Sequence, residues 1–169
     1  ALVTGASGGI GAAIARALHG RGATVVLHGT RAERLAELAG ELGERTHVVK
    51  ANLSSREEAA GLIDVAAEAA GAPVTILVNN AGITRDNLAM RMKDEQWDEV
   101  LNVNMTAAMM IARAALRPMM KARHGRIISV SSIVGVTGNP GQANYAASKA
   151  GMIGFSKALA AEEASRGIT

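Results

Sequence analysis

The chain contains a single tyrosine, Tyr145, and one of its five lysines, Lys149, follows four residues later. The surrounding apolar residues recur at helical spacing, and positions i and i+4 share one face of a helix. A phenol donates a proton near neutral pH only if its pKa falls from about 10, a cost of roughly 4 kcal/mol. An ammonium about 4 Å away supplies about that much. The pair predicts an acid that protonates an alkoxide; the alternative is a solvated helix face.

Two further polar positions are candidates for the same chemistry. Ser131-Ser132 follows a predicted strand, and a hydroxyl there can hydrogen-bond a substrate oxygen, although serines at strand ends are common. Asn104 falls inside a long helical segment, where asparagine is a poor helix former. Its position indicates a kink or a polar role, or simply an exposed site.

A glycine-rich segment lies where the first predicted strand must turn into the first helix. Glycine permits positive φ and lets the backbone approach a pyrophosphate, which then meets the free N–H groups at the helix N-terminus. The alternative is a tight turn that binds nothing. The predicted cofactor-binding residues of this turn are Gly5, Ala6, Ser7, Gly8, Gly9, Ile10 and Gly11.

The second predicted strand ends in His28-Gly29-Thr30-Arg31, with no acidic residue. Sites for NAD usually place Asp or Glu there to bind the ribose 2′-hydroxyl, whereas a cation suits the 2′-phosphate of NADP. The sequence therefore favours NADP(H), bound near Thr30 and Arg31. The alternative is that Arg31 starts a helix and points into solvent.

The fourth predicted strand ends in Asn79-Asn80-Ala81-Gly82. Ligands of open α/β sheets bind at the carboxyl ends of the strands. Polar amides with small neighbours can brace that edge and let a cofactor lie close, so these four residues are further cofactor-binding candidates. A plain turn is the competing interpretation.

The elements that must position these residues alternate strictly. Strands are expected at 1–4, 24–28, 46–50, 74–78 and 126–130, and helices at about 10–20, 31–42, 55–70, 94–121 and 143–165. Alternating strands and helices form right-handed βαβ units, which give a doubly wound parallel sheet with helices on both faces. We expect an α/β, Rossmann-like fold and one nucleotide-binding domain over residues 1–169.

Composition excludes several classes of protein. There is no cysteine, so disulfides and thiolate metal sites are excluded, and the four histidines are too scattered to suggest a metal site. The net charge of +3 is too small to argue for nucleic acid. No segment approaches the roughly 20 apolar residues that a membrane span needs. We expect a cytoplasmic protein with no metal.

Together these residues resemble the short-chain dehydrogenases/reductases in order and spacing, over nearly the whole chain. The resemblance implies that Ser132 positions a substrate carbonyl and that Tyr145 is the general acid. It implies that Lys149 holds the nicotinamide ribose and lowers the tyrosine pKa, and that Asn104 anchors a water of a proton relay. The motifs that carry it are Thr4–Gly11, Asn79-Asn80-Ala81-Gly82, Asn104, Ser132 and Tyr145-x-x-x-Lys149.

Within that superfamily, residues 81–88 and 139–151 look closely like the bacterial 3-oxoacyl-acyl-carrier-protein reductases. This implies NADPH-dependent reduction of a 3-oxoacyl thioester to the 3-hydroxyacyl form in fatty acid biosynthesis, usually by a homotetramer. It also implies that Arg123 and Arg166 dock the acidic acyl carrier protein. A basic cluster at 117–126 supports docking, although cations also stabilise a helix C-terminus locally.

Two departures from the family pattern bear on these expectations. Many relatives carry Asp and an aliphatic residue after the third strand to cover the adenine, and this chain has Asn52-Leu53, which we expect to take that place. The family's last strands and substrate loop would lie beyond Thr169. We therefore expect a chain truncated at its C-terminus and, for residues 1–169 alone, little activity.

Three rival functions remain at this stage. The first is another reductase of the superfamily that acts on acetoacetyl-CoA, a sugar alcohol or a different carbonyl compound. The second is a non-catalytic NADP-sensing protein, which the presence of Ser132, Tyr145 and Lys149 disfavours. The third is a nucleic-acid binder, which only the basic charge supports.

Overall fold

The computed structural model describes residues 1–169 and contains one parallel five-stranded sheet of order β3-β2-β1-β4-β5. Leu2 pairs with Val26 on one side and with Leu77 on the other, so β1 is the central strand. The strands are β1 (Leu2–Val3), β2 (Val25–His28), β3 (Thr46–Val49), β4 (Ile76–Asn79) and β5 (Arg126–Ser129). The predicted doubly wound α/β fold is confirmed.

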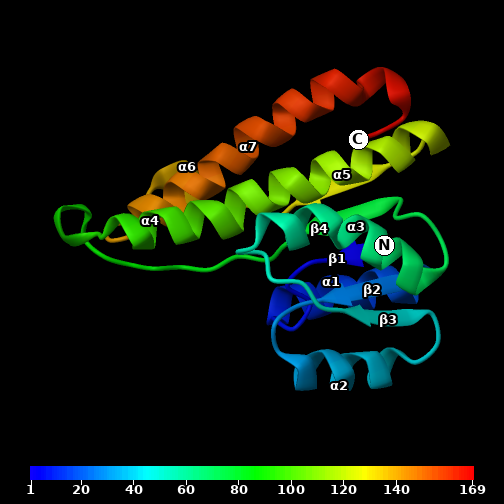
Figure 1. Cartoon of the computed structure of the whole chain (residues 1–169). Coiled ribbons are helices and arrows are strands. Elements are labelled where there is room, and N and C mark those ends of the chain that lie inside the picture. Colours follow the sequence, from blue (N-terminus) through cyan, green and yellow to red (C-terminus); the bar gives the residue numbers. More distant parts are fainter.

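Helices cover both faces of the sheet, and each face has its own core (Figure 1). One core holds Val25 and Leu27 of β2 against α1 (Gly9–Gly20) and α2 (Ala32–Leu42). The other holds Val26 of the same strand against α3 (Arg56–Ala70) and α5 (Ala107–Ala122). Because successive side chains of a strand point to opposite faces, an unbroken apolar strand is what a sheet buried on both sides requires.

The helix predicted at 94–121 is three elements rather than one. It consists of α4 (Asp94–Leu101), a π-helical segment η2 (Asn102–Thr106) and α5. A π-helix bonds i to i+5 and is rare except as a short bulge, frequently at functional sites. Val103 and Asn104 of η2 are buried, so the irregularity faces the interior. Periodicity alone does not reveal it, because the apolar residues on either side keep the helical pattern.

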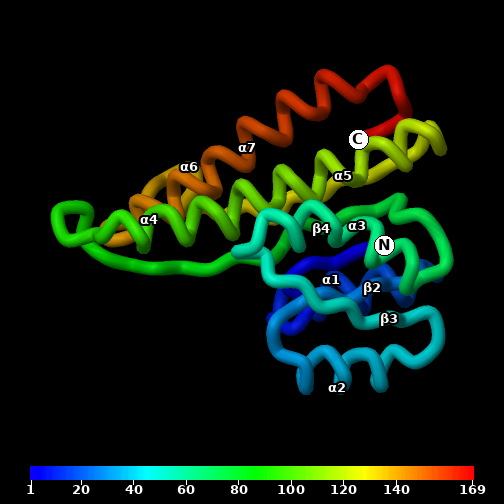
Figure 2. The backbone as a smooth tube through the Cα atoms, viewed as in Figure 1, coloured from blue at the N-terminus to red at the C-terminus, as the bar shows by residue number.

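The remaining elements complete the face that carries α3 and α5. The long helix α7 (Ala143–Glu163) continues into a short 3₁₀ helix, η3 (Ala164–Arg166), where one helix to 165 was predicted. Two short elements were not predicted, η1 (Ala89–Arg91) and α6 (Val134–Thr137), because three or four residues are too few to show a period. The segment between β4 and α4 extends away from the sheet along α4 and loops back at its far end (Figure 2).

The carboxyl ends of β1, β4 and β5 lie at one edge of the sheet, since parallel neighbours pair in register there. The glycine turn, Asn79-Asn80-Ala81-Gly82 and Ser132 follow these three ends. None of the helices combines the length and apolar character that crossing a bilayer requires. No three His, Asp or Glu side chains gather closely enough to hold a metal ion.

Candidate active site

The turn after β1 is built from glycines because its backbone touches other backbone. Gly5 has φ +67°, and a Cβ there would lie 2.9 Å from Cα of Ala81. A Cβ on Gly11 would overlap the carbonyl oxygen of Gly5 and lie 2.7 Å from Nδ2 of Asn80. Only glycine fits at both positions, so the first turn of α1 lies directly over the end of the sheet.

Asn80 fixes this turn to the end of β4. Its side-chain amide donates to the carbonyl oxygen of Thr4 at 2.9 Å. The Thr4 hydroxyl in turn accepts the N–H groups of Asn80 and Ala81, at 3.0 and 3.1 Å. Asn79 differs from the prediction, because its amide is buried and donates to Ala108 in α5, at 3.4 Å, instead of lining the site. Along a strand, alternate side chains face opposite sides, so the two asparagines cannot share one task.

A pocket of about 420 Å³ opens above this edge of the sheet. It brings together the glycine turn, the end of β2, the Asn52-Leu53 segment and the end of β4, as predicted. His28, Ser54, Ile83, Glu99 and Val103 line it too, although no sequence signal identified them. The predicted residues that line it are Gly5, Ser7, Gly8, Gly9, Ile10, Gly11, Thr30, Arg31, Asn52, Leu53, Asn80, Ala81 and Gly82.

Ala6 is the one residue of the turn that does not line this pocket. It is 1% exposed and its N–H donates to the carbonyl oxygen of His28 at 2.8 Å, which ties the turn to β2. The Arg31 guanidinium crosses the same turn and donates from Nη2 to the carbonyl oxygen of Ser7 at 2.6 Å. Arg31 is exposed and makes no ion pair with a carboxylate.

Tyr145 and Lys149 lie side by side on α7, with the Lys149 nitrogen 5.7 Å from the centre of the tyrosine ring. Lys149 is 5% exposed and donates from Nζ to the carbonyl oxygen of Val130 at 2.8 Å. Burial lowers the pKa of the Lys149 ammonium. A Cβ on Gly82 would lie 3.7 Å from that nitrogen. The pair therefore stands at the rim of the pocket, which it does not itself line.

Ser132 lies at the end of β5, and its Oγ accepts the N–H of Val134 at 3.2 Å. Because a hydroxyl accepts and donates independently, its O–H remains able to donate. The neighbouring Ser131 instead donates to the carbonyl oxygen of Lys149 at 2.9 Å. Of the two serines, Ser131 fixes the helix and Ser132 keeps a free donor.

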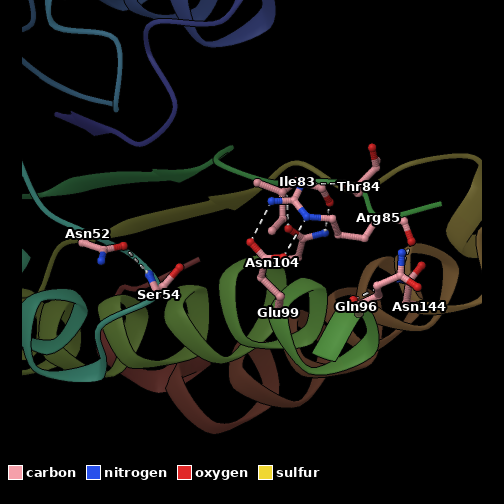
Figure 3. A network of polar contacts seen from close by, with 9 residues as sticks. All are labelled: Asn52, Ser54, Ile83, Thr84, Arg85, Gln96, Glu99, Asn104 and Asn144. Carbon is pink, nitrogen blue, oxygen red and sulfur yellow. Dashed lines mark hydrogen bonds and ion pairs between the residues drawn. The ribbon is translucent and has the colours of Figure 1, made fainter. Parts of the chain in front are cut away.

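Asn104 of η2 holds the chain that leaves β4 (Figure 3). Its Oδ1 accepts the N–H of Ile83 at 2.8 Å, and its Nδ2 donates to the carbonyl oxygen of Ile83 at 2.9 Å and to Oγ of Ser148 at 3.2 Å. Ser148 donates in turn to the carbonyl oxygen of Tyr145 at 2.8 Å. Both donors of the Asn104 amide are thus used within the protein, so its side chain is a clamp.

Asn144 is a second clamp, which sequence reasoning missed (Figure 3). Its side chain is fully buried and donates to the carbonyl oxygens of Arg85 and Gln96, at 2.9 and 3.1 Å. Its Oδ1 accepts the N–H of Tyr145 at 2.8 Å. An amide directly before the only tyrosine, in the first turn of a helix, was the available signal. The Tyr145 backbone is therefore held at both its N–H and its carbonyl group.

The whole chain, residues 1–169, matches the family model for short chain dehydrogenase. The protein belongs to the short-chain dehydrogenase family. Nodulation protein G of Rhizobium sp. strain N33 is 63% identical over 169 residues, which is 100% of this chain and 69% of that protein. The 3-oxoacyl-acyl-carrier-protein reductase FabG of Vibrio harveyi is 52% identical, with the same coverage. That of Rickettsia felis is 51% identical over 99% of this chain and 68% of its own.

Membership of the short-chain dehydrogenase family implies an oxidoreductase with a nicotinamide cofactor, and the pocket fits such a group. A Cβ at Gly5 or Gly11 would push the turn away from the sheet edge, so glycine at both positions keeps the first turn of α1 at the wall of the pocket. The first-turn amides of α1 have no acceptor within the helix, which suits a pyrophosphate. The residues that would hold the phosphates are thus those of the turn over β1.

The two arginines expected to dock a partner lie together at the far end of α5. Arg123 has φ +48° and ends α5, and its Nη2 is 3.4 Å from the carbonyl oxygen of Ser165. Arg166 lies 3.6 Å from Glu163 and contacts Sδ of Met120. The two side chains therefore belong to one surface of the short-chain dehydrogenase, away from the pocket.

We expect Asn144→Ala to lower the free energy of unfolding of this short-chain dehydrogenase by about 1–3 kcal/mol, because the carbonyl groups of Arg85 and Gln96 lose a donor that is fully buried. Urea unfolding measures the change. Asn139→Ala is the matched control, since that exposed amide bonds only to Gln142, and it should stay within about 0.5 kcal/mol of the parent. Equal stabilities for the two variants would contradict the clamp.

His28 predicts a pH dependence of stability. Its ring is 1% exposed, Nε2 lies 3.0 Å from the carbonyl oxygen of Ala51, and burial lowers its pKa. As pH falls below the ordinary value of about 6.5, the unfolded chain binds a proton that the native state resists. The free energy of unfolding should then decrease by up to about 1.4 kcal/mol per pH unit, and it should recover as pH rises. Unfolding of His28→Gln should show a shallower slope; parallel curves would refute this.

Proposed function

We propose that the protein is an NADPH-dependent reductase that converts a 3-oxoacyl thioester on acyl carrier protein to the 3-hydroxyacyl form. The observation that carries the proposal is the Tyr145–Lys149 pair at the rim of the pocket that the glycine turn lines. Support comes from relatives named 3-oxoacyl-acyl-carrier-protein reductase that are 51% and 52% identical over this chain. By the same likeness we propose a homotetramer that works in the cytoplasm.

The reacting group in this proposal is a ketone carbonyl, and the chain supplies the proton and the orientation. When bound, the reduced nicotinamide supplies a hydride to the carbonyl carbon. The free O–H of Ser132 donates a hydrogen bond to the carbonyl oxygen and fixes its direction. Tyr145 gives its phenolic proton to the same oxygen as the C–O π bond breaks. One hydride and one proton thus convert C=O to CH–OH.

Lys149 serves two purposes in this scheme. One of its three N–H groups donates to Val130, which leaves two donors for the nicotinamide ribose and for the tyrosine side. Its charge is buried beside the phenol ring, where it favours the phenolate that remains after proton transfer. Asn104 fixes the loop after β4, so we propose that any relay water is held by the main chain near Asn104 rather than by its amide.

The preference for NADPH rests on charge at the end of β2. Gly29, Thr30 and Arg31 follow that strand and none of them is acidic, and Arg31 crosses the glycine turn with no carboxylate bound to it. An unpaired guanidinium suits a phosphate bidentately, whereas it gains nothing from a ribose hydroxyl. We propose that Thr30 and Arg31 contact the 2′-phosphate, and that Asn52 and Leu53 lie along the adenine.

Acyl carrier protein is acidic, so a basic surface on this protein would bind it by charge complementarity. Arg123 and Arg166 lie together where α5 and η3 end, and Lys121 and Arg126 flank Arg123 in the sequence. Such a surface steers an anionic partner toward the enzyme at a rate that falls with salt. We propose it as the docking surface for the carrier protein.

A second candidate is a related reductase that acts on a coenzyme A thioester or another carbonyl compound. Its support is the 63% identity to a protein named for nodulation. A comparison of kcat/KM for acetoacetyl-acyl-carrier-protein and acetoacetyl-CoA separates the two, because only the former engages a docking surface. A non-catalytic NADP sensor is disfavoured, because it does not need a buried lysine beside the tyrosine, as Lys149 is beside Tyr145.

The full-length protein should oxidise NADPH with acetoacetyl thioesters, and Tyr145→Phe should lower kcat by about 10²–10⁴ because the general acid is lost. The dissociation constant for NADPH should change less than about threefold, measured by fluorescence titration. Trp97→Phe is an aromatic control away from the pocket lining and should keep its activity. A Tyr145→Phe enzyme within tenfold of the parent kcat would contradict the proposed acid.

Arg31→Ala should weaken NADPH binding by about 10- to 100-fold and leave NADH binding unchanged, because only NADPH carries the phosphate that pairs with the guanidinium. Titration of each reduced cofactor into the protein measures both constants. Arg21→Ala removes an exposed arginine at the opposite end of α1 and serves as the control. An equal loss of affinity for NADPH and NADH would mean that Arg31 only supports the glycine turn, through its bond to Ser7, and does not bind the 2′-phosphate.

A further inference from the structure

Gly135 of α6 lies directly against the main chain of Lys149 in α7. A Cβ at position 135 would lie 2.8 Å from the carbonyl carbon of Lys149, 2.9 Å from its Cβ and 2.9 Å from the amide nitrogen of Ala150. None of these atoms can rotate away, as the end of a long side chain can. Relief from 2.8 Å to an ordinary contact of 3.4 Å therefore separates the two helices by about 0.6 Å. The backbone of Gly135 does not have positive φ, so space rather than conformation excludes a side chain here.

Of the two helices in this contact, α6 is the one that would give way. Lys149 is 5% exposed and Ser148 is fully buried, and α7 is further fixed by the bond from Asn144 to Arg85, at 2.9 Å. In contrast, α6 has four residues and none of them is buried, and its Val136 is 72% exposed. A side chain at position 135 would thus displace α6 and leave α7 in place.

Ser132 is tied to α6 and would move with it. Its carbonyl oxygen accepts the N–H of Gly135 at 3.0 Å, and its Oγ accepts the N–H of Val134 at 3.2 Å. The residue before it, Ser131, donates to the carbonyl oxygen of Lys149 at 2.9 Å. The chain is therefore held against Lys149 on both sides of Ser132, by a hydrogen bond at Ser131 and by close packing at Gly135.

We propose that Gly135 is a positioning residue for the carbonyl reduction. Because it carries no side chain, α6 lies on the main chain of Lys149, and this contact sets where the Ser132 hydroxyl stands relative to Tyr145. The inference rests on the proposed function and deepens it. Gly135 does not line the pocket, so it acts through Ser132 and not on the cofactor. A shift of about 0.6 Å matters because catalytic groups must be held to within about 0.5 Å, and a misplacement of about 1 Å can cost about 10²-fold in rate.

A crystal structure of the full-length Gly135→Ala protein tests the geometry without any need for activity. When it is superposed on the parent through α7, Ser132 should lie about 0.5 Å farther from the main chain of Lys149, with α7 itself unchanged. An unmoved Ser132, or a bend in α7 in place of a shift of α6, would overturn the proposal.

A double-mutant cycle of Gly135→Ala and Ser132→Ala tests whether the glycine acts through the serine. Ser132→Ala alone should lower kcat by about 10²–10³, because a donor to the carbonyl oxygen is lost. Gly135→Ala should lower kcat about tenfold in the parent, but less than about twofold in the Ser132→Ala protein, where no hydroxyl remains to be misplaced. The same loss in both backgrounds would overturn the proposal, since the glycine would then act elsewhere.

Cofactor affinity and a matched glycine separate positioning from general damage. The dissociation constant of Gly135→Ala for NADPH, from fluorescence titration, should stay within about threefold of the parent, because α6 contributes no residue to the pocket. A larger loss would contradict a role through Ser132. Gly40→Ala is the control, because a Cβ there meets no atom within 4 Å, and its kcat should equal that of the parent.

Ser131→Ala carries the test if alanine at position 135 prevents folding. It loosens the same segment by removing the bond to Lys149 and adds no atom. Its kcat should fall at least about twofold in the parent and stay unchanged in the Ser132→Ala protein. A kcat equal to that of the parent would then overturn the proposal.

Failure of this inference and failure of the proposed function give different results. A parent protein that does not reduce acetoacetyl-acyl-carrier-protein contradicts the proposed function. The place of Ser132 in the Gly135→Ala crystal structure then still decides whether the glycine positions it. A parent that reduces the thioester, together with equal losses in the two backgrounds, contradicts only the positioning role.

Discussion

The site depends on the close approach of two backbone segments, the turn after β1 and the chain leaving β4. Gly5 and Gly11 lack the Cβ atoms that would hold these segments apart, and Thr4 and Asn80 exchange the hydrogen bonds that hold them together. Because β1 and β4 are neighbours in a parallel sheet, their carboxyl ends meet at one edge. The first turn of α1, the pocket and the rim at Gly82 all take their positions from this contact.

The π-helical segment connects the two ends of the pocket. Asn102 donates to the carbonyl oxygen of Ser54 at 2.9 Å, on the side expected to hold the adenine. Asn104, two residues on, holds Ile83 and Ser148, on the side of the tyrosine. A buried amide with both donors used, as at Asn104, specifies one arrangement of the chains that it joins. An irregular helix is thus retained where its side chains fix two loops at once.

Tyr145 is positioned by hydrogen bonds to its backbone. Asn144 Oδ1 accepts the N–H of Tyr145, and the Ser148 hydroxyl donates to its carbonyl oxygen. Asn144 also donates to Arg85 in the loop after β4, and Ser148 is joined to that loop through Asn104. Lys149 is then held one turn later by Val130 of the strand-five end. These bonds fix Tyr145 and Lys149 relative to the pocket rim, which is the pre-organisation that the proposed proton transfer requires.

The sequence alone determined the fold class, the order of the elements and the family. Strict alternation of apolar strands with helical segments favours a single topology, the doubly wound parallel sheet. The Tyr145–Lys149 pair and the glycine turn are recognised from residue types at short, fixed spacings, so the sequence suffices to find them. Only the tertiary structure revealed the π segment, the clamp at Asn144 and the burial of Asn79. Each of these depends on which segments distant in sequence lie within a few ångströms, as in the hydrogen bonds from Asn144 to Arg85 and Gln96. Periodicity records which face of an element is buried, but it does not record what lies against that face.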